Sequence, residues 1–160
     1  MGQGSTSNQV THRLVPREIN GFWRARIHPW SYDFDYLGHL TAAIYPKAFE
    51  EGRVRYLAER WATPRPAYVV ASHRMEYLAE IRETTEPLQV LIRPLHVGRS
   101  SLRLEEALLD PDERVCNTSV VTLVAWDTTA RRSRPLTIPE RTALEHDMAT
   151  LTGAGSPLIP

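Results

Sequence analysis

Cys116 is the only cysteine in the chain, so a disulfide within the chain is excluded and a cysteine-based metal cage is disfavoured. Net charge is also lacking, because 19 Lys and Arg balance 19 Asp and Glu, and no overall field draws the protein to nucleic acid or an anionic membrane. No segment reaches the roughly 18 to 20 apolar residues that span a bilayer, and residues 1–6 lack the basic and apolar regions of a signal peptide. We therefore expect a cytoplasmic protein without nucleic-acid or membrane partners.

Several sequence patterns of catalysis are absent as well. The chain lacks the phosphate loop of nucleotide-binding proteins, the Gly-x-Ser-x-Gly elbow of serine hydrolases and any CxxC pair. Lysine is nearly absent, since Lys47 is the only one, a bias that suggests a bacterial origin with GC-rich coding. What the chain does have is 42% hydrophobic residues over a length of 160, enough for one domain with a core and too few for two.

We expect that domain to span residues 19–152, between a disordered tail over 1–18 and a flexible tail over 153–160. The pattern of apolar residues predicts strands over 22–29, 69–77, 88–93, 102–105 and 115–126. Helix-compatible residues fill 41–62 and 139–151, and residues 110–114 have the chemistry of a turn. One strand, a long helix and about four antiparallel strands predict an α+β fold whose sheet buries one face on that helix.

Three residues of these elements carry further predictions. Gly52 disfavours the long helix by about 1 kcal/mol relative to alanine, so we expect helix and sheet to approach closely there. Arg53 beside it is expected to form an ion pair at a contact between subunits. Cys116, among the valines of the last long strand, is expected to be a buried structural thiol.

Candidate chemistry gathers just before the long helix, where Asp35 stands three residues ahead of Gly38 and His39. A helix begins with about four unpaired N–H groups and roughly half a positive charge, which can stabilise the oxyanion that develops on an acyl carbonyl. The arrangement therefore points to acyl chemistry at a helix N-terminus. Asp33 and Asp35 could instead be loop carboxylates that cap the helix.

This segment resembles the Asp-x-x-Gly-His-x-Asn-Asn-x-x-Tyr signature of the 4-hydroxybenzoyl-CoA thioesterase branch of the hotdog-fold acyl-CoA thioesterases. The resemblance continues through residues 50–53, 75–78 and 98–101 and spans roughly residues 22–144. It implies a hotdog fold, in which an antiparallel sheet of about five strands wraps around one long central helix. It also implies a homodimer with active sites at the subunit interface, and in some relatives a tetramer.

The resemblance assigns catalytic roles to four residues. Asp35 matches the carboxylate that attacks the thioester or activates water. The amide of Ala42, with Thr41 beside it, matches the oxyanion donor, and His39 would hydrogen-bond the carbonyl, stabilise Asp35 or simply pack in the loop. The sequence departs from the signature at Thr41 and Ala42, which replace the paired asparagines. Backbone donation survives that change, whereas any role of the asparagine side chains does not.

The resemblance also assigns substrate contacts, on the long helix, on the strand over 69–77 and in the turn near residue 99. These residues are Tyr45, His73, Arg74, Tyr77, Arg99, Ser100 and Ser101. Arg99 matches a position that contacts the phosphates of coenzyme A, although a plain hairpin turn would also explain residues 98–101. A structural role for Tyr77 is an equal alternative.

The function that follows is hydrolysis of an acyl-CoA, or of an acyl-carrier-protein thioester, to a free acid and a thiol. No cofactor is expected beyond the coenzyme A of the substrate. No metal is expected either, because neither His28 nor His39 has the spacing to a second histidine that metal sites use. The alternatives are a hotdog hydratase or dehydratase, and a module that binds acyl-CoA without turnover.

Overall fold

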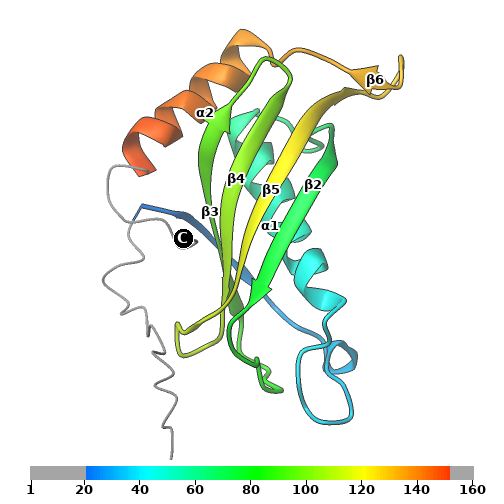
Figure 1. The fold of residues 1–160 in the computed structure, drawn as a ribbon, viewed down its shortest axis with the longest axis vertical. Coiled ribbons are helices and arrows are strands. Elements are labelled where there is room, and N and C mark those ends of the chain that lie inside the picture. Colours follow the sequence, from blue (N-terminus) through cyan, green and yellow to red (C-terminus); the bar gives the residue numbers. More distant parts are fainter. Residues whose placement is uncertain (1–20, 152–160) are drawn as a thin grey trace, which may run out of the picture.

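The structure is a computed structural model that describes residues 21–151 (Figure 1). The two tails predicted at the ends of the chain, residues 1–18 and 153–160, lie outside the described residues. The elements follow in the order β1 (Trp23–Ile27), the 3-10 turn η2 (Ser31–Asp33), α1 (Ile44–Arg60), β2 (Tyr68–Tyr77), β3 (Leu88–Val97), β4 (Ser101–Leu109), β5 (Val115–Asp127), β6 (Arg132–Ser133) and α2 (Ile138–Leu151).

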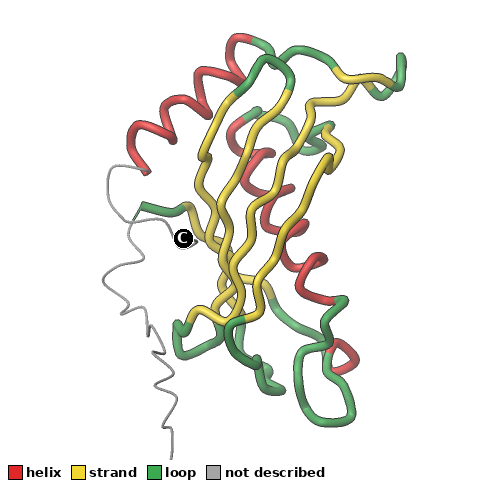
Figure 2. Tube along the Cα trace, viewed as in Figure 1, coloured by secondary structure: helices red, strands yellow, loops and turns green. Residues whose placement is uncertain are grey.

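The strands form one antiparallel sheet in the order β1-β3-β4-β5-β2, and the short β6 pairs with β5 (Figure 2). Helix α1 crosses one face of this sheet, and α2 packs against β3. The prediction of an α+β fold with one strand, a main helix and then antiparallel strands is therefore confirmed. The turn η2 and the two-residue strand β6 were not predicted.

The bounds of several elements differ from the prediction. Helix α1 begins at Ile44 rather than at residue 41, because residues 41–43 form a turn in which the Ile44 amide donates to the Thr41 carbonyl at 2.8 Å. Strand β3 continues past Pro94 through an irregularity in its pairing with β4. Both β3 and β4 are longer than predicted because side chains on both of their faces are buried, which removes the alternation that marks a half-buried strand.

Gly52 lies where α1 meets the sheet most closely, as predicted. A Cβ atom built on Gly52 would lie 2.6 Å from Cγ1 of Val90 on β3, a distance that real side chains do not adopt. Around this point the helix buries Phe49, Tyr56 and Leu57 completely. Cys116 on β5 is also fully buried, which confirms the prediction of a structural thiol, and burial raises its pKa to about 11.

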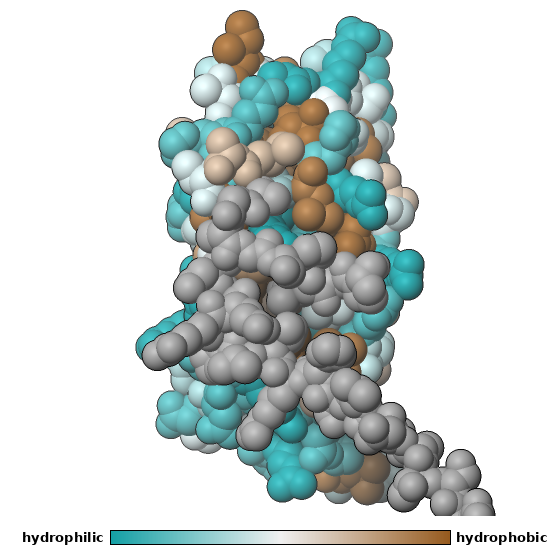
Figure 3. Space-filling view, turned by 60° about the vertical axis from the view of Figure 1, so that its left-hand side comes forward, coloured by the Kyte–Doolittle hydropathy of each residue, from teal (hydrophilic) through white to brown (hydrophobic). Residues whose placement is uncertain are grey.

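Strand β2 is an edge of the sheet, with β5 as its only neighbour among the described residues. It is ten residues long, and apolar side chains near it, including Val70, Tyr77 and Leu78, are exposed. A long edge strand with exposed apolar side chains is a ready template for pairing with another strand. Elsewhere, on the described part of the face seen in Figure 3, hydrophobic residues lie in separate patches between hydrophilic ones.

Candidate active site

Asp35 lies in a tight loop between η2 and α1. Its Oδ1 accepts hydrogen bonds from the amides of Leu37, at 2.8 Å, and His39, at 3.1 Å, and its own amide donates to the His39 carbonyl at 2.8 Å. Gly38 closes the loop with a φ of 75°, a conformation that favours glycine. These contacts hold Oδ1 in place, whereas Oδ2 has no partner among the described residues and the side chain is exposed. Asp35 thus presents a fixed, accessible carboxylate oxygen.

Asp33 holds the two ends of this loop together. Its Oδ2 accepts from the Trp30 amide at 2.8 Å, and its carbonyl accepts from the Thr41 amide at 2.9 Å. The side chain is buried. Asp33 therefore acts as a structural residue of the loop, consistent with the interpretation of Asp33 as a loop carboxylate, while Asp35 remains open to solvent.

The amide of Ala42 is the open donor at the start of α1. The Thr41 amide already donates to Asp33, whereas the Ala42 amide donates to no group in the part of the chain that the structure describes. Ala42 is exposed and lies one residue before the helix N-cap, Ala43, where the partial positive charge of the helix is concentrated. Of the two predicted oxyanion donors, only Ala42 is placed to meet an incoming oxygen.

Two of the predicted substrate residues lie beside this amide. The Tyr77 hydroxyl donates to the Ala42 carbonyl at 3.4 Å, and the Tyr77 ring meets the Tyr45 ring edge-on with centroids 5.0 Å apart. Tyr77 is 54% exposed, whereas Tyr45 is buried, and burial raises the pKa of Tyr45 to about 12. The exposed Tyr77 can contact a ligand directly, and Tyr45 supports it from behind.

The side chain of His39 contacts a different carboxylate, that of Glu80. Its Nε2 lies 2.9 Å from Oε2 of Glu80, in the segment after β2, and both side chains are partly exposed. The hydrogen bonds between His39 and Asp35 involve only the backbone of His39. The structure therefore gives His39 a carboxylate partner that the sequence analysis did not include.

His73 belongs to a buried polar cluster between α1 and the sheet. Its Nε2 lies 3.1 Å from an Arg53 nitrogen and 2.8 Å from the Ser119 hydroxyl, and its ring packs edge-on against Phe49. Burial, with the positive charge of Arg53, lowers the pKa of His73 to about 4, so the ring is neutral at neutral pH. Nε2 of His73 is therefore engaged inside the protein.

Arg53 forms an ion pair, as predicted, but the predicted place was wrong. Its Nε donates to Oε1 of Glu106 on β4 at 2.7 Å, inside the same chain, with side-chain exposures of 2% and 0%. A second Arg53 nitrogen and the Ser119 hydroxyl donate to Oε2 of Glu106, at 3.3 Å and 2.7 Å. Burial raises the pKa of Glu106, and these three donors oppose that rise. The pair is a core feature rather than a subunit contact.

The remaining predicted contacts lie elsewhere. Arg74 alternates with His73 along β2, so it points to the opposite face of the sheet, where it is exposed and pairs with Glu76. The turn that holds Arg99 and Ser100 lies at the far end of the sheet from Ala42 (Figure 1). Ser101, at the start of β4, pairs with Val124, near the Tyr68 end of β2, and not near the Tyr77 end that touches Ala42. Ten residues of β2 span roughly 30 Å, so one chain does not bring these residues to Asp35.

Two acidic residues of these clusters were missed by the sequence analysis. Glu106 could have been suspected, because Glu105 and Glu106 are adjacent in an apolar strand and alternation must turn one of them inward. Glu80 carries no such signal, since it lies in a polar connection between strands and meets His39 only through the fold.

A metal cluster and a membrane-spanning helix are both absent from the described residues. Within residues 21–151, no group of three or more His, Cys, Asp and Glu side chains could hold a metal ion. No helix in the same range is long and apolar enough to cross a membrane.

Comparison with known proteins defines the class. Residues 29–145 match the model of the Thioesterase-like superfamily, and the chain belongs to that family. This match includes Asp35, Ala42 and all of α1 and the main strands after it. Among curated proteins, no sequence matches the chain.

Solved structures of similar fold agree with this assignment. A thioesterase from Thermus thermophilus, solved with coenzyme A and Zn, is 26% identical with a TM-score of 0.69, over 82% of this chain and 97% of its own. A Staphylococcus aureus protein solved in complex with CoA is 16% identical with a TM-score of 0.70, over 89% and 90%. A protein from Pseudomonas aeruginosa is 23% identical with a TM-score of 0.71, over 81% and 93%. The antiparallel sheet and main helix of this chain are thus those of thioesterase-superfamily, hotdog-like proteins.

Proposed function

We propose that this protein hydrolyses an acyl-CoA thioester, or an acyl-carrier-protein thioester, to a free acid and a thiol. The observation that carries the proposal is that one loop before α1 holds both an exposed, fixed Asp35 carboxylate and the open Ala42 amide. Membership of the Thioesterase-like superfamily supports it, and so do the relatives solved with coenzyme A. The resemblance to the 4-hydroxybenzoyl-CoA branch remains part of the proposal.

The geometry supplies the two groups that the reaction needs. In the nucleophilic route, Oδ2 of Asp35 attacks the thioester carbon, and the negative charge on the carbonyl oxygen is stabilised by the Ala42 N–H and the helix start. The C–S bond then breaks, the thiolate leaves and is protonated, and water hydrolyses the acyl-Asp35 anhydride. In the general-base route, Asp35 takes a proton from a water that attacks the same carbon. Both routes consume one water and use the same two groups.

Asp35→Asn is expected to lower kcat/KM for thioester hydrolysis by at least about a hundredfold, or roughly 2.7 kcal/mol of barrier. Asparagine keeps an acceptor for the Leu37 and His39 amides but provides neither an anionic nucleophile nor a base. Thiol release from short, long and aromatic acyl-CoAs and from an acyl-carrier protein measures the effect. Asp112→Asn, on the exposed turn between β4 and β5, is the matched control and should leave turnover unchanged.

Other outcomes of this assay would point elsewhere. Equal turnover by the wild type and Asp35→Asn would place the chemistry at another residue. Tight binding of acyl-CoA without thiol release would indicate a binding module. Addition of water to an enoyl-CoA with the thioester intact would indicate a hydratase.

We also infer that the active protein is a homodimer, with a tetramer as a further possible assembly, in which the β2 edges of two copies pair antiparallel. Such pairing would use the exposed edge described above. It would place the Tyr77 end of one β2 beside the Tyr68 end of the other. Arg99 of the same chain lies at the opposite end of the sheet from Asp35 and Ala42. In the double sheet, Arg99 of the partner copy would instead lie at the same end as these two residues. The predicted catalytic and coenzyme A contacts would thus form one site from two subunits.

Mixing two inactive variants tests this arrangement. Arg99→Ala is expected to lower kcat/KM by roughly 10- to 100-fold through loss of a charge-assisted contact to phosphate. When Asp35→Asn and Arg99→Ala chains are unfolded and refolded together, half of the dimers are mixed and one of their two sites is complete. Turnover should then recover to about a quarter of the wild type.

The same experiment can also reject the arrangement. If Asp35 and Arg99 act within one chain, mixed dimers contain no complete site and no activity returns. Sedimentation that finds only monomers of the wild type under assay conditions would also contradict it. Each variant refolded alone is the control.

A further inference from the structure

Within residues 21–151, the side chain of His39 is held by one residue, Glu80. Nε2 of His39 lies 2.9 Å from Oε2 of Glu80, with side-chain exposures of 41% and 40%. The other carboxylate oxygen, Oε1, accepts from Nε of Arg82 at 2.8 Å. Glu80 therefore stands between an arginine and the histidine of the candidate site.

The contact fixes which nitrogen of His39 carries a proton. Arg82 lowers the pKa of Glu80, so its carboxylate is ionised at neutral pH and can only accept hydrogen bonds. Nε2 of His39 must then be the N–H that donates to it. In the neutral ring Nδ1 is left as the acceptor.

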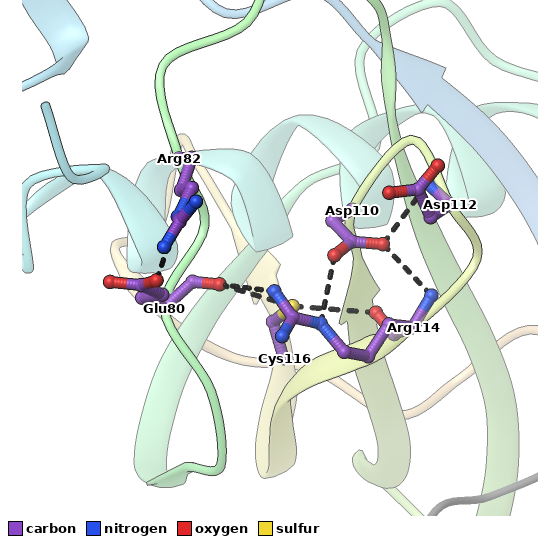
Figure 4. A network of polar contacts seen from close by, with 6 residues as sticks. All are labelled: Glu80, Arg82, Asp110, Asp112, Arg114 and Cys116. Carbon is purple, nitrogen blue, oxygen red and sulfur yellow. Dashed lines mark hydrogen bonds and ion pairs between the residues drawn. The ribbon is translucent and has the colours of Figure 1, made fainter.

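The segment that carries Glu80 is anchored to the rest of the sheet. The Glu80 carbonyl accepts from Arg114 at 2.8 Å, and Nε of Arg114 donates to Oδ2 of Asp110 at 2.9 Å (Figure 4). Oδ1 of Asp110 accepts from the amides of Asp112, at 3.1 Å, and Arg114, at 2.9 Å. The turn between β4 and β5 thus fixes the backbone of Glu80.

The same segment also holds the backbone on both sides of His39. The Leu40 amide donates to the Ile81 carbonyl at 2.8 Å, and the Glu83 amide donates to the Gly38 carbonyl at 2.8 Å. Backbone and side chain of His39 are therefore both set by the connection after β2. The ion pair between His39 and Glu80 adds little to stability, because partly exposed pairs contribute little in water. Its main effect is therefore to orient the imidazole ring of His39.

We propose that Glu80 is a positioning residue of this site, which holds His39 with Nε2 protonated and Nδ1 as its acceptor. The role rests on the proposed thioesterase function and adds His39 to it, as a group that assists at the thioester held between Asp35 and Ala42. Glu80 itself does not touch the substrate and acts only through His39. Loss of Glu80 leaves the loop closed by its backbone hydrogen bonds but frees the imidazole to turn and to exchange tautomers.

The structural part of the proposal is tested without any activity. Nitrogen-15 chemical shifts of the imidazole, assigned with His39→Gln, should report a fully protonated Nε2 and a bare Nδ1 for the neutral ring of the wild type. In Glu80→Ala the two shifts should move toward each other as both tautomers become populated. Glu83→Ala, on the same segment with an exposed side chain, is the matched control and should retain the wild-type shifts. Identical His39 shifts in the wild type and Glu80→Ala would overturn the proposal.

The functional part is tested by a double-mutant cycle on thioester hydrolysis. Glu80→Ala should lower kcat by on the order of tenfold with little change in KM or in the melting temperature, because a misplaced group lowers turnover without removing substrate contacts. In a His39→Ala background the same substitution should have no further effect. An equal loss in both backgrounds, or no loss in either, would refute a role through His39. If no variant and no wild-type sample releases thiol, the thioesterase proposal fails, while the imidazole shifts still decide whether Glu80 positions His39.

Discussion

Replacement of Ala42 by proline is expected to lower kcat for thioester hydrolysis by about a hundredfold to a thousandfold, the loss seen when one oxyanion donor is removed from an acyl-transfer site. Proline has no N–H, so the substitution deletes the open Ala42 amide at the start of α1. Thiol release under saturating acyl-CoA measures the loss. Since the donor acts on charge that develops in the transition state, KM should change much less than kcat.

The position tolerates proline on structural grounds. Thr41 and Ile44 are the ends of a turn, closed by the 2.8 Å hydrogen bond from the Ile44 amide to the Thr41 carbonyl, and Ala42 is its second residue. Proline is favoured at that place in common turns, and Ala43 after it has a φ of −68° and a ψ of −17°, as the third residue of such a turn requires. The Ala42 amide makes no hydrogen bond within the described residues that proline would break.

Ala42→Ser is the matched control, because it changes the side chain at an exposed site but keeps the amide. Turnover close to that of the wild type is expected for this variant. If Ala42→Pro folds with an unchanged melting temperature and still turns over substrate at the wild-type rate, the oxyanion is bound elsewhere. A loss of equal size in both variants would instead indicate that the side chain at this position contacts the substrate.

The sequence was sufficient for the order of the elements because each depends on nearby residues. Alternation over residues 69–77 and the β-branched run from Val115 are local patterns, and both became strands. Gly52 in the middle of the helix predicted a close approach of helix and sheet, because a close neighbour explains a glycine at that position. Val90 is that neighbour. The start of α1 was placed too early because Thr41 and Ala42 are compatible with a helix but close a turn instead.

The contacts of the site join residues that are far apart in the sequence. A local sequence pattern cannot predict such contacts. His39 and Glu80 are brought together by the loop that pairs residue 39 with residue 82, and Arg53 meets Glu106 across the helix and the sheet. Charge pairing is unspecific in sequence, since the chain offers 19 acidic partners for its basic residues. Motif resemblance could therefore point to Asp35 and Ala42 but could not assign partners to His39 or Arg53.

The second large effect is expected from the buried pair of Arg53 and Glu106. Arg53→Met should lower the free energy of unfolding by about 3–5 kcal/mol, because it leaves a buried carboxylate without its charged partner. Urea unfolding followed by circular dichroism measures the loss. The double variant with Arg53→Met and Glu106→Leu should recover much of it, since well-packed apolar residues can replace a buried ion pair. Arg74→Met, which removes an exposed pair with Glu76, is the control and should change stability by less than about 1 kcal/mol.

The pH dependence of that loss separates a missing charge partner from a packing defect. In Arg53→Met, burial still raises the pKa of Glu106, and the arginine that opposes this rise is gone. A carboxyl whose pKa is higher in the folded than in the unfolded state stabilises the fold below its unfolded pKa and loses that contribution as pH rises through the folded value. The deficit of Arg53→Met relative to the wild type should therefore shrink between neutral and mildly acidic pH. A deficit that stays constant over this range would mean that Arg53 contributes through packing alone. His73 on β2 and Ser119 on β5 share this cluster, so the ion pair also connects α1 to β2, the strand that brings Tyr77 to Ala42.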